Sequence, residues 1–166
     1  MDQTKLRRTS WDVSAAGTDI GGVDEVDPSG IKLEKDPVRV GTAGKIKLDD
    51  RVIGIQDGSV VKIQFRETAT WAKMKLMFPW LGAGTDLVPP TGALMTAYAV
   101  QWILHPHDKP ADTSEDIVLY KAVPRQGYAI KRDGTKDDVF EVELEPYPDP
   151  TKVGTSANPY GKIGAP

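Results

Sequence analysis

Apolar and polar residues alternate with a period of two in segment after segment of this chain. In residues 60–65, the side chains of Val61, Ile63 and Phe65 fall on one face, and residues 139–145 repeat the pattern. Successive side chains of a strand point to opposite faces of its sheet, so this pattern is typical of strands with one buried face. The 16 glycines and 13 prolines supply the turns that such strands need. The chain is therefore constrained to a mainly β fold.

The same criterion predicts seven or eight short strands over the whole chain. Turn residues separate them, among them DPSG at residues 27–30 and the Asp-Gly pairs at 57–58 and 133–134. Pro37 removes a ladder donor and indicates an edge strand or a kink. The predicted strands cover residues 18–23, 30–40, 45–55, 60–65, 97–104, 116–121, 127–132 and 139–145.

One segment, residues 68–81, has a helical period instead. Thr70 is a suitable N-cap, and Pro79 is expected to end or kink the helix. Apolar side chains recur there every three or four positions, at Trp71, Met74, Met77, Phe78 and Leu81. A helix with this stripe covers the apolar face of a sheet.

These elements predict a mainly β fold, an antiparallel β-sandwich or barrel with one flanking α-helix and a long extended hairpin. We expect residues 18–148 to form that domain. Residues 1–17 are expected to be an N-terminal arm, and residues 149–166, rich in Pro, Gly, Ser and Asn, an extended C-terminal tail.

Composition excludes several classes of protein. The chain has no cysteine, which excludes a disulfide scaffold and a zinc site built on thiolates. Its first residues are polar and charged, unlike a secretory signal peptide, and no apolar run approaches the length of a membrane span. The net charge of −3 lacks the dense Lys/Arg face of a protein that grips phosphates. We expect a soluble protein made in the cytoplasm, without membrane insertion.

The one possible metal cluster in the sequence consists of His105, His107, Asp108 and Asp112. Pro106 and the Lys-Pro pair that follows predict a loop there, and no further ligand is fixed elsewhere, so we expect no metal site. The chain also lacks a nucleophile elbow, a phosphate-binding loop and a dinucleotide fingerprint. The sequence thus predicts no catalytic residues, no cofactor and no enzymatic activity.

A row of glutamates occupies the polar face of the strand predicted at residues 139–145. Glu141, Glu143 and Glu145 have three interpretations: a solvated strand face, a catalytic carboxylate set, or a surface that repels polyanions. A wall along which DNA must slide needs the last property, because a cationic wall would trap it.

In their order and spacing, three blocks of sequence resemble the major tail tube proteins of long-tailed, siphovirus-like bacteriophages, a family related to the type VI secretion tube protein. The first block is TDIGGV at residues 18–23, GIKLE at 30–34 and the long hairpin to residue 55. The second is the strand at residues 60–65, which leads directly into the helix at 70–81. The third comprises WILHP at 102–106, SEDI at 114–117, KA at 121–122, FEVEL at 140–144 and YPDP at 147–150.

The resemblance implies a structural virion protein that self-assembles into hexameric rings, which stack into a hollow tail tube and conduct DNA during ejection. Its partners would be copies of itself, the tape measure, tail terminator and distal tail proteins, and DNA in transient, non-specific passage. Its location would be the virion tail, after synthesis in the host cytoplasm. Strands at the sheet edges of neighbouring subunits would pair and close a continuous barrel.

Two sets of residues are candidates for this function. The candidates for a lumen-facing surface lie on polar strand faces: Lys62, Gln64, Arg66, Glu141, Glu143 and Glu145. The candidates for contacts between rings lie in the long hairpin of residues 38–52, which is too long for a bare loop: Arg39, Lys45, Lys47, Asp49, Asp50 and Arg51.

Functions of other kinds are alternatives. A tail terminator or a decoration protein would form one closed ring or bind a capsid, without indefinite stacking. An enzyme would have to use His105 and His107 with nearby acids. A carbohydrate-binding β-sandwich would use aromatic side chains, although these fall mostly on predicted apolar stripes, which favours core packing: Trp71, Trp80, Trp102 and Tyr98.

Overall fold

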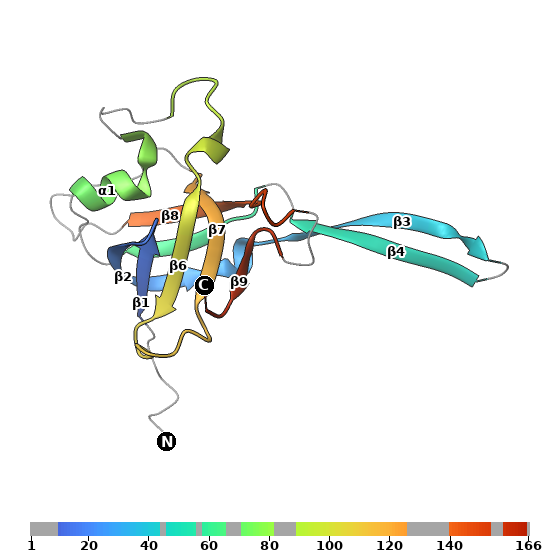
Figure 1. Cartoon of the computed structure of the whole chain (residues 1–166), viewed down its shortest axis with the longest axis horizontal. Coiled ribbons are helices and arrows are strands. Elements are labelled where there is room, and N and C mark those ends of the chain that lie inside the picture. Colours follow the sequence, from blue (N-terminus) through green and yellow to red (C-terminus); the bar gives the residue numbers. More distant parts are fainter. Residues whose placement is uncertain are drawn as a thin grey trace, which may run out of the picture.

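The computed structural model of the chain describes residues 10–43, 46–55, 58–65, 71–81, 89–125, 140–153 and 158–165. Figure 1 shows a barrel with a helix at one side and a two-stranded hairpin that projects from it. The α-helix is α1 (Trp71–Met77), and single turns of 3-10 helix form η2 (Pro28–Gly30), η3 (Pro79–Leu81) and η4 (Met95–Ala97). The strands are β1 (Trp11–Ala15), β2 (Thr18–Asp27), β3 (Leu33–Ala43), β4 (Ile46–Ile55), β5 (Val61–Phe65), β6 (Val100–Pro106), β7 (Ile117–Pro124), β8 (Phe140–Tyr147) and β9 (Gly161–Ile163).

Six of the described strands close into an antiparallel barrel in the order β6–β1–β2–β5–β8–β7, because β6 also pairs with β7. The predicted mainly β fold with one helix is therefore confirmed, in its barrel form. However, this closure within one chain differs from the expectation that edge strands of neighbouring subunits pair into one continuous barrel. Strands that already have neighbours on both sides cannot offer a continuous edge for pairing between subunits.

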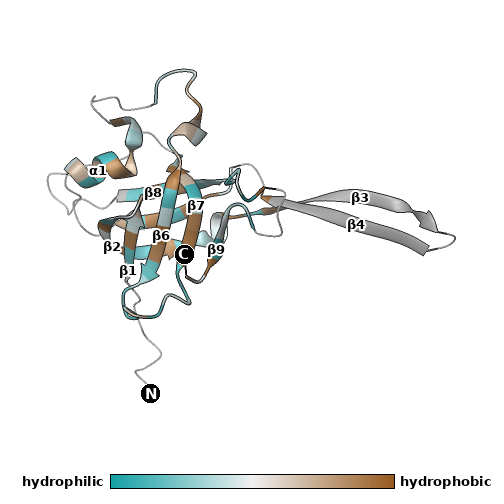
Figure 2. Ribbon diagram, viewed as in Figure 1, coloured by the Kyte–Doolittle hydropathy of each residue, from teal (hydrophilic) through white to brown (hydrophobic). Residues whose placement is uncertain are grey.

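The barrel encloses an apolar core. Val61, Ile63 and Phe65 are all buried, as their alternation predicts, and the side chain of Trp102 is fully buried in the same core. Figure 2 shows apolar positions along the barrel strands and in α1. The segment after β5 covers the barrel, since its apolar side chains belong to the same core: Met74, Met77, Phe78, Trp80 and Leu81. None of the described helices is long and apolar enough to cross a membrane.

Part of the predicted N-terminal arm is a barrel strand. Trp11–Ala15 forms β1, which lies between β2 and β6 and buries Val13 and Ala15 in the core. The turn to β2 consists of Ala16 and Gly17, with φ values of 50° and 77°. Two positive φ values are what a two-residue hairpin turn requires. Residues 1–9 of the predicted arm lie outside the described residues.

The predicted C-terminal tail also returns to the sheet. Gly161–Ile163 forms β9, which pairs with β7 from Ile117 to Leu119. The approach is close, because a Cβ added at Gly161 would lie 2.3 Å from the carbonyl oxygen of Val118. Only glycine fits at this point, which explains why a tail poor in apolar residues still docks.

Other boundaries differ from the sequence predictions. The helical stripe is predicted to be buried throughout, but Trp71 is 48% exposed. β6 extends through His105 to Pro106, where the sequence predicts a polar loop. β3 continues to Ala43 past an irregularity between Arg39 and Thr42, where the sequence predicts a break. The N-cap at Thr70, the turns at 57 and 133–134 and the strand at 127–132 lie outside the described residues.

Two tryptophans of opposite burial test this packing. Trp102 has no exposed surface and its Nε1 donates to the carbonyl of Ala122 at 3.2 Å, so Trp102→Ala should lower the free energy of unfolding by about 3–5 kcal/mol. The control Trp71→Ala removes a half-exposed ring and should change it by less than about 1 kcal/mol. Urea denaturation followed by circular dichroism measures both. Equal effects of the two substitutions would contradict the described core.

Candidate functional site

A charged surface covers the outside of three neighbouring barrel strands, β2, β5 and β8. Because Val61, Ile63 and Phe65 face the core, the alternate residues of β5 face outward, and the same holds for β8 around buried Val142 and Leu144. The strand register then brings the outward residues together. We call them the charged barrel face: Glu25, Asp27, Lys62, Gln64, Glu141 and Glu143.

Lys62 lies at the centre of this face. It is opposite Glu143 in the β5–β8 ladder and opposite Asp27 in the β2–β5 ladder. Its Nζ lies 3.4 Å from Oε1 of Glu141 and 3.4 Å from Oε1 of Glu143. The hydrogen bond to Glu143, followed by the charge of Glu141, raises the pKa of Lys62. Lys62 therefore stays protonated, and its charge is shared between two carboxylates.

Asp27 is the last residue of β2 and also the N-cap of the η2 turn that follows. Its Oδ1 accepts a hydrogen bond from the backbone N–H of Ser29 at 2.8 Å, which caps η2. The Ser29 side chain and this backbone bond lower the pKa of Asp27, so the group is a carboxylate at neutral pH. With four carboxylates and one ammonium, the charged barrel face has a net charge of 4 × (−1) + 1 = −3.

The charged barrel face has a small depression. This depression is lined by Glu25, Asp27, Lys62, Gln64 and Glu141 and has a volume of about 50 Å³. A water molecule occupies roughly 30 Å³ of liquid volume, so this space is large enough for water but has no room for a sugar or a nucleotide. The arrangement suits a surface that repels anions better than a substrate site.

Four of the six predicted lumen candidates meet here, namely Lys62, Gln64, Glu141 and Glu143. Glu145 lies further along β8, opposite Val123 of β7, and Arg66 lies outside the described residues.

The sequence prediction missed two members of the charged barrel face, Glu25 and Asp27. A register shift between Val23 and Glu25 breaks the alternation of β2 and turns these two carboxylates outward. The acidic residues were visible in the sequence, but the face that they occupy depends on this irregularity.

The β3–β4 hairpin forms a separate two-stranded sheet. Its register places Arg39 opposite Asp49, Val38 opposite Asp50, Pro37 opposite Arg51 and Thr42 opposite Lys47. Lys45, the remaining candidate for ring contacts, lies outside the described residues. Pro37 is tolerated because each strand of a two-stranded ribbon has one free edge.

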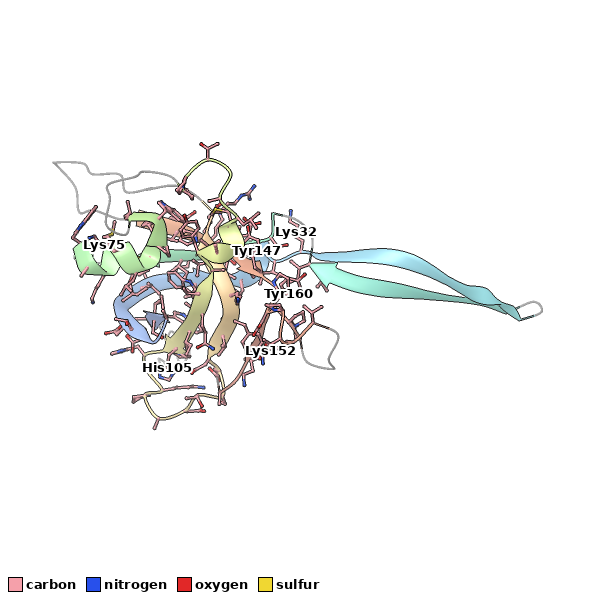
Figure 3. All side chains as sticks on the ribbon, turned by 45° about the horizontal axis from the view of Figure 1, so that its top comes forward. Lys32, Lys75, His105, Tyr147, Lys152 and Tyr160 are labelled. Carbon is pink, nitrogen blue, oxygen red and sulfur yellow. The ribbon has the colours of Figure 1, made fainter. Side chains whose placement is uncertain are left out.

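The two histidines are tied to different carboxylates. His105 Nδ1 lies 2.6 Å from Asp116 Oδ1, and His107 Nδ1 lies 2.9 Å from Asp12 Oδ2. The first pair links β6 to the start of β7, and the second links the turn after β6 to β1; Figure 3 shows His105 at the end of the barrel away from the hairpin. Within the described ranges, no group of three or more His, Cys, Asp or Glu side chains is arranged to hold a metal ion.

The aromatic residues considered for carbohydrate binding do not form one surface. Trp80 and Trp102 are 5% and 0% exposed, and Tyr98 is half-buried with its ring 6.1 Å from that of Trp80. Trp71 is exposed, with Lys75 Nζ 5.9 Å from its ring centre. The chain matches no protein-family model and no curated protein sequence.

The His107–Asp12 pair makes stability depend on pH. The hydrogen bond to Asp12, followed by its charge, raises the pKa of His107 above the ordinary 6.5, with a smaller influence from Asp108. A raised pKa stabilises the fold at pH values below about 6.5, and this contribution disappears as the pH rises through the folded-state value. Asp12→Asn should therefore lower the thermal midpoint at pH 5 more than at pH 9.

The pKa itself is measured by NMR titration of the His107 ring. It should exceed 6.5 in the unsubstituted protein, fall in Asp12→Asn, and fall less in the control Asp108→Asn. A value that Asp12→Asn leaves unchanged would contradict the described pair.

Proposed function

We propose that this chain is a structural virion protein that self-assembles into stacked hexameric rings and forms a phage tail tube, the conduit for DNA during ejection. The observation that carries the proposal is the β3–β4 hairpin, a separate two-stranded sheet that projects away from the closed barrel (Figure 1). The hexameric ring and the further partners come from the resemblance: the tape measure protein, the tail terminator and the distal tail protein. The proposal requires no cofactor and no catalytic residue.

A projecting ribbon of this kind needs a partner. At about 3.3 Å per residue, the 11 residues of β3 span roughly 35 Å. A two-stranded hairpin is only marginally stable in water by itself, and neither of its outer edges pairs with another of the described strands. Burial against another molecule supplies the missing stabilisation. In an assembly of identical subunits, that molecule is a neighbouring copy.

The direction of the hairpin favours stacking over a single closed ring. A contact between the hairpin of one copy and the body of another joins two different surfaces, so the pair still offers one free receiving surface, on the first copy, and one free hairpin, on the second. Such a contact repeats without limit when successive copies are displaced along the hairpin, whereas copies related by rotation alone would close into a ring. This argument supports a tube subunit over a tail terminator, which would stop at one ring.

The charged barrel face suits the inner wall of such a tube. DNA phosphates are repelled by a surface with a net charge of −3, and the cation at Lys62 is held between Glu141 and Glu143. A wall of this kind lets DNA pass without retaining it. We therefore propose that the charged barrel face lines the lumen.

Removal of the hairpin tip tests the proposal. Deletion of residues 41–50 should abolish tubes and leave rings or monomers, because the ribbon that bridges successive rings is shortened. The barrel should keep its thermal midpoint, since the hairpin shares no ladder with the described barrel strands. Negative-stain electron microscopy and sedimentation detect tubes, and circular dichroism checks the fold. Normal tubes from a correctly folded deletion variant would refute the proposed role of the hairpin.

The position of the charged barrel face is tested by reconstruction of the assembled tube. Glu141 and Glu143 should line the inner wall, and tubes should retain no short duplex DNA after a wash at low salt. In Glu141→Lys/Glu143→Lys tubes the wall becomes cationic, so DNA should be retained, increasingly so as salt is lowered. A reconstruction with both glutamates on the outer surface would contradict the assignment.

A further inference from the structure

Strand β6 connects two different surfaces at opposite ends of the barrel. Residues 89–99 precede its first residue, and residues 107–116 follow its last one. The helical segment 71–81 lies beside the first of these surfaces, because the ring centroids of Trp80 and Tyr98 are 6.1 Å apart. We call residues 71–81 and 89–99 together the helix end, and residues 107–116 the turn end.

The helix end and the turn end face along a direction that the proposed tube contacts leave free. In Figure 1 the hairpin projects sideways from the barrel, whereas α1 lies toward the top and the turn end at the bottom. The charged barrel face is on β2, β5 and β8, the half of the barrel that lies behind β6 and β7 in this view. If the hairpin follows the tube axis and the charged barrel face lines the lumen, the neighbours around a ring lie above and below.

A closed ring of more than two copies repeats one contact between two different surfaces of the chain. With the hairpin and the charged barrel face assigned elsewhere, these two surfaces are the helix end of one copy and the turn end of the next. Figure 3 labels Lys75 at the helix end and His105 beside the turn end, and the two lie at opposite ends of the barrel.

The helix end exposes apolar side chains together with positive charge. Trp71 is 48% exposed, and Leu94 is 74% exposed. The described residues of this end include two lysines, Lys73 and Lys75, and no Asp or Glu, so their net charge is +2. The Nζ atom of Lys75 lies 5.9 Å from the ring centre of Trp71. An exposed aromatic ring beside a cation suits a partner with both apolar and anionic groups.

The turn end has the opposite charge. With neutral histidine, its four carboxylates and one ammonium give a net charge of 4 × (−1) + 1 = −3. Hydrogen bonds from Ser114 lower the pKa of Asp112, which is therefore a carboxylate at neutral pH. Pro110 and Ala111 are exposed and stand between Asp108 and Asp112 in the sequence. The turn end thus offers a small apolar surface flanked by acids.

Internal hydrogen bonds hold the turn end in shape. The backbone N–H of Asp112 donates to the carbonyl of Lys109 at 2.9 Å, and Asp112 Oδ1 accepts from the N–H of Ser114 at 2.9 Å. Lys109 Nζ also pairs with Glu115 across the turn. A turn that is already ordered loses little conformational entropy when it meets a partner.

We propose that the helix end of one copy docks against the turn end of a second copy, which is its neighbour around the ring. Charges of +2 and −3 attract, whereas two helix ends or two turn ends would repel, so the contact favours a ring over a two-fold dimer. Trp71 would pack against Pro110 and Ala111. The inference rests on the proposed function, to which it adds the lateral contact within each ring.

A mixture of two charge variants tests this pairing. Ala72→Glu/Lys75→Glu makes the helix end more acidic, and Asp108→Lys/Ala111→Lys makes the turn end more basic; all four positions except half-buried Lys75 are exposed. Each variant alone brings like charges together, so the protein concentration needed for assembly should rise by about tenfold or more. In an equimolar mixture every contact between unlike copies is attractive again, and alternating rings should form at about the unsubstituted concentration.

Sedimentation of each variant and of the mixture measures the assembled fraction, and circular dichroism checks that each variant is folded. The control is Lys152→Glu, which changes the charge equally in the C-terminal segment, outside both ends (Figure 3). It should assemble like the unsubstituted chain. A mixture that assembles no better than either variant alone would overturn the inference.

Engineered cysteines give a second measurement, since the natural chain has none. In Ala72→Cys/Ala111→Cys the two positions lie at opposite ends of the barrel, and a disulfide needs Cα atoms within about 7 Å, so any bond must join two copies. Mild oxidation of assembled protein should give covalent products that end at the ring size, because a closed ring has no free end. The control Ala72→Cys/Val153→Cys, with Val153 60% exposed in the C-terminal segment, should give no more product than the single variants.

The outcomes separate this inference from the proposed function. If the unsubstituted chain forms tubes but neither the mixture nor the cysteines at positions 72 and 111 give the expected result, the lateral contact lies elsewhere and the tube proposal stands. Disulfides that join position 72 of one copy to position 72 of another would place two helix ends together and overturn the inference. A chain that stays monomeric at all concentrations would contradict both proposals.

Discussion

Pairing between β6 and β7 joins the two ends of one sheet, and the rest of the molecule depends on it. β7 has β6 on one side, and β8 and β9 follow each other along the other side. Closure gives the alternating apolar residues a single interior, which α1 and η3 cover with Met77, Phe78 and their neighbours. Closure also leaves the barrel strands without unpaired edges, and β proteins avoid uncontrolled association in this way.

Some strands lie outside the closed barrel, and each of them has one edge that pairs with no other described strand. Among the described strands, these are the β3–β4 hairpin and β9. Among the described strands, these are the ones left for pairing with another copy, because the barrel strands already have partners on both sides. We therefore propose an assembly of closed barrels connected by projecting ribbons, in place of the expected continuous barrel shared between subunits.

The sequence correctly predicted those elements whose own residues carry a clear local pattern of apolar and polar positions. The alternation of Val61, Ile63 and Phe65 is such a pattern, and so are the polar positions Lys62, Glu141 and Glu143 that face outward. The sequence did not predict which strands lie side by side. The position of Lys62 between two glutamates therefore follows only from the strand register of the structure. The elements missed by the sequence prediction are those that a partner strand stabilises. β1 ends in small residues with weak strand preference, and β9 has three residues that dock because Gly161 permits a close approach.

The central proposal is that copies of this chain stack through their hairpins into a tube. The most direct test is negative-stain electron microscopy of the purified protein over a range of concentrations, with sedimentation of the same samples. Stacking predicts hollow tubes of rings, with an axial repeat close to the roughly 35 Å span of the hairpin. Single rings that never stack, or monomers at every concentration, would contradict it.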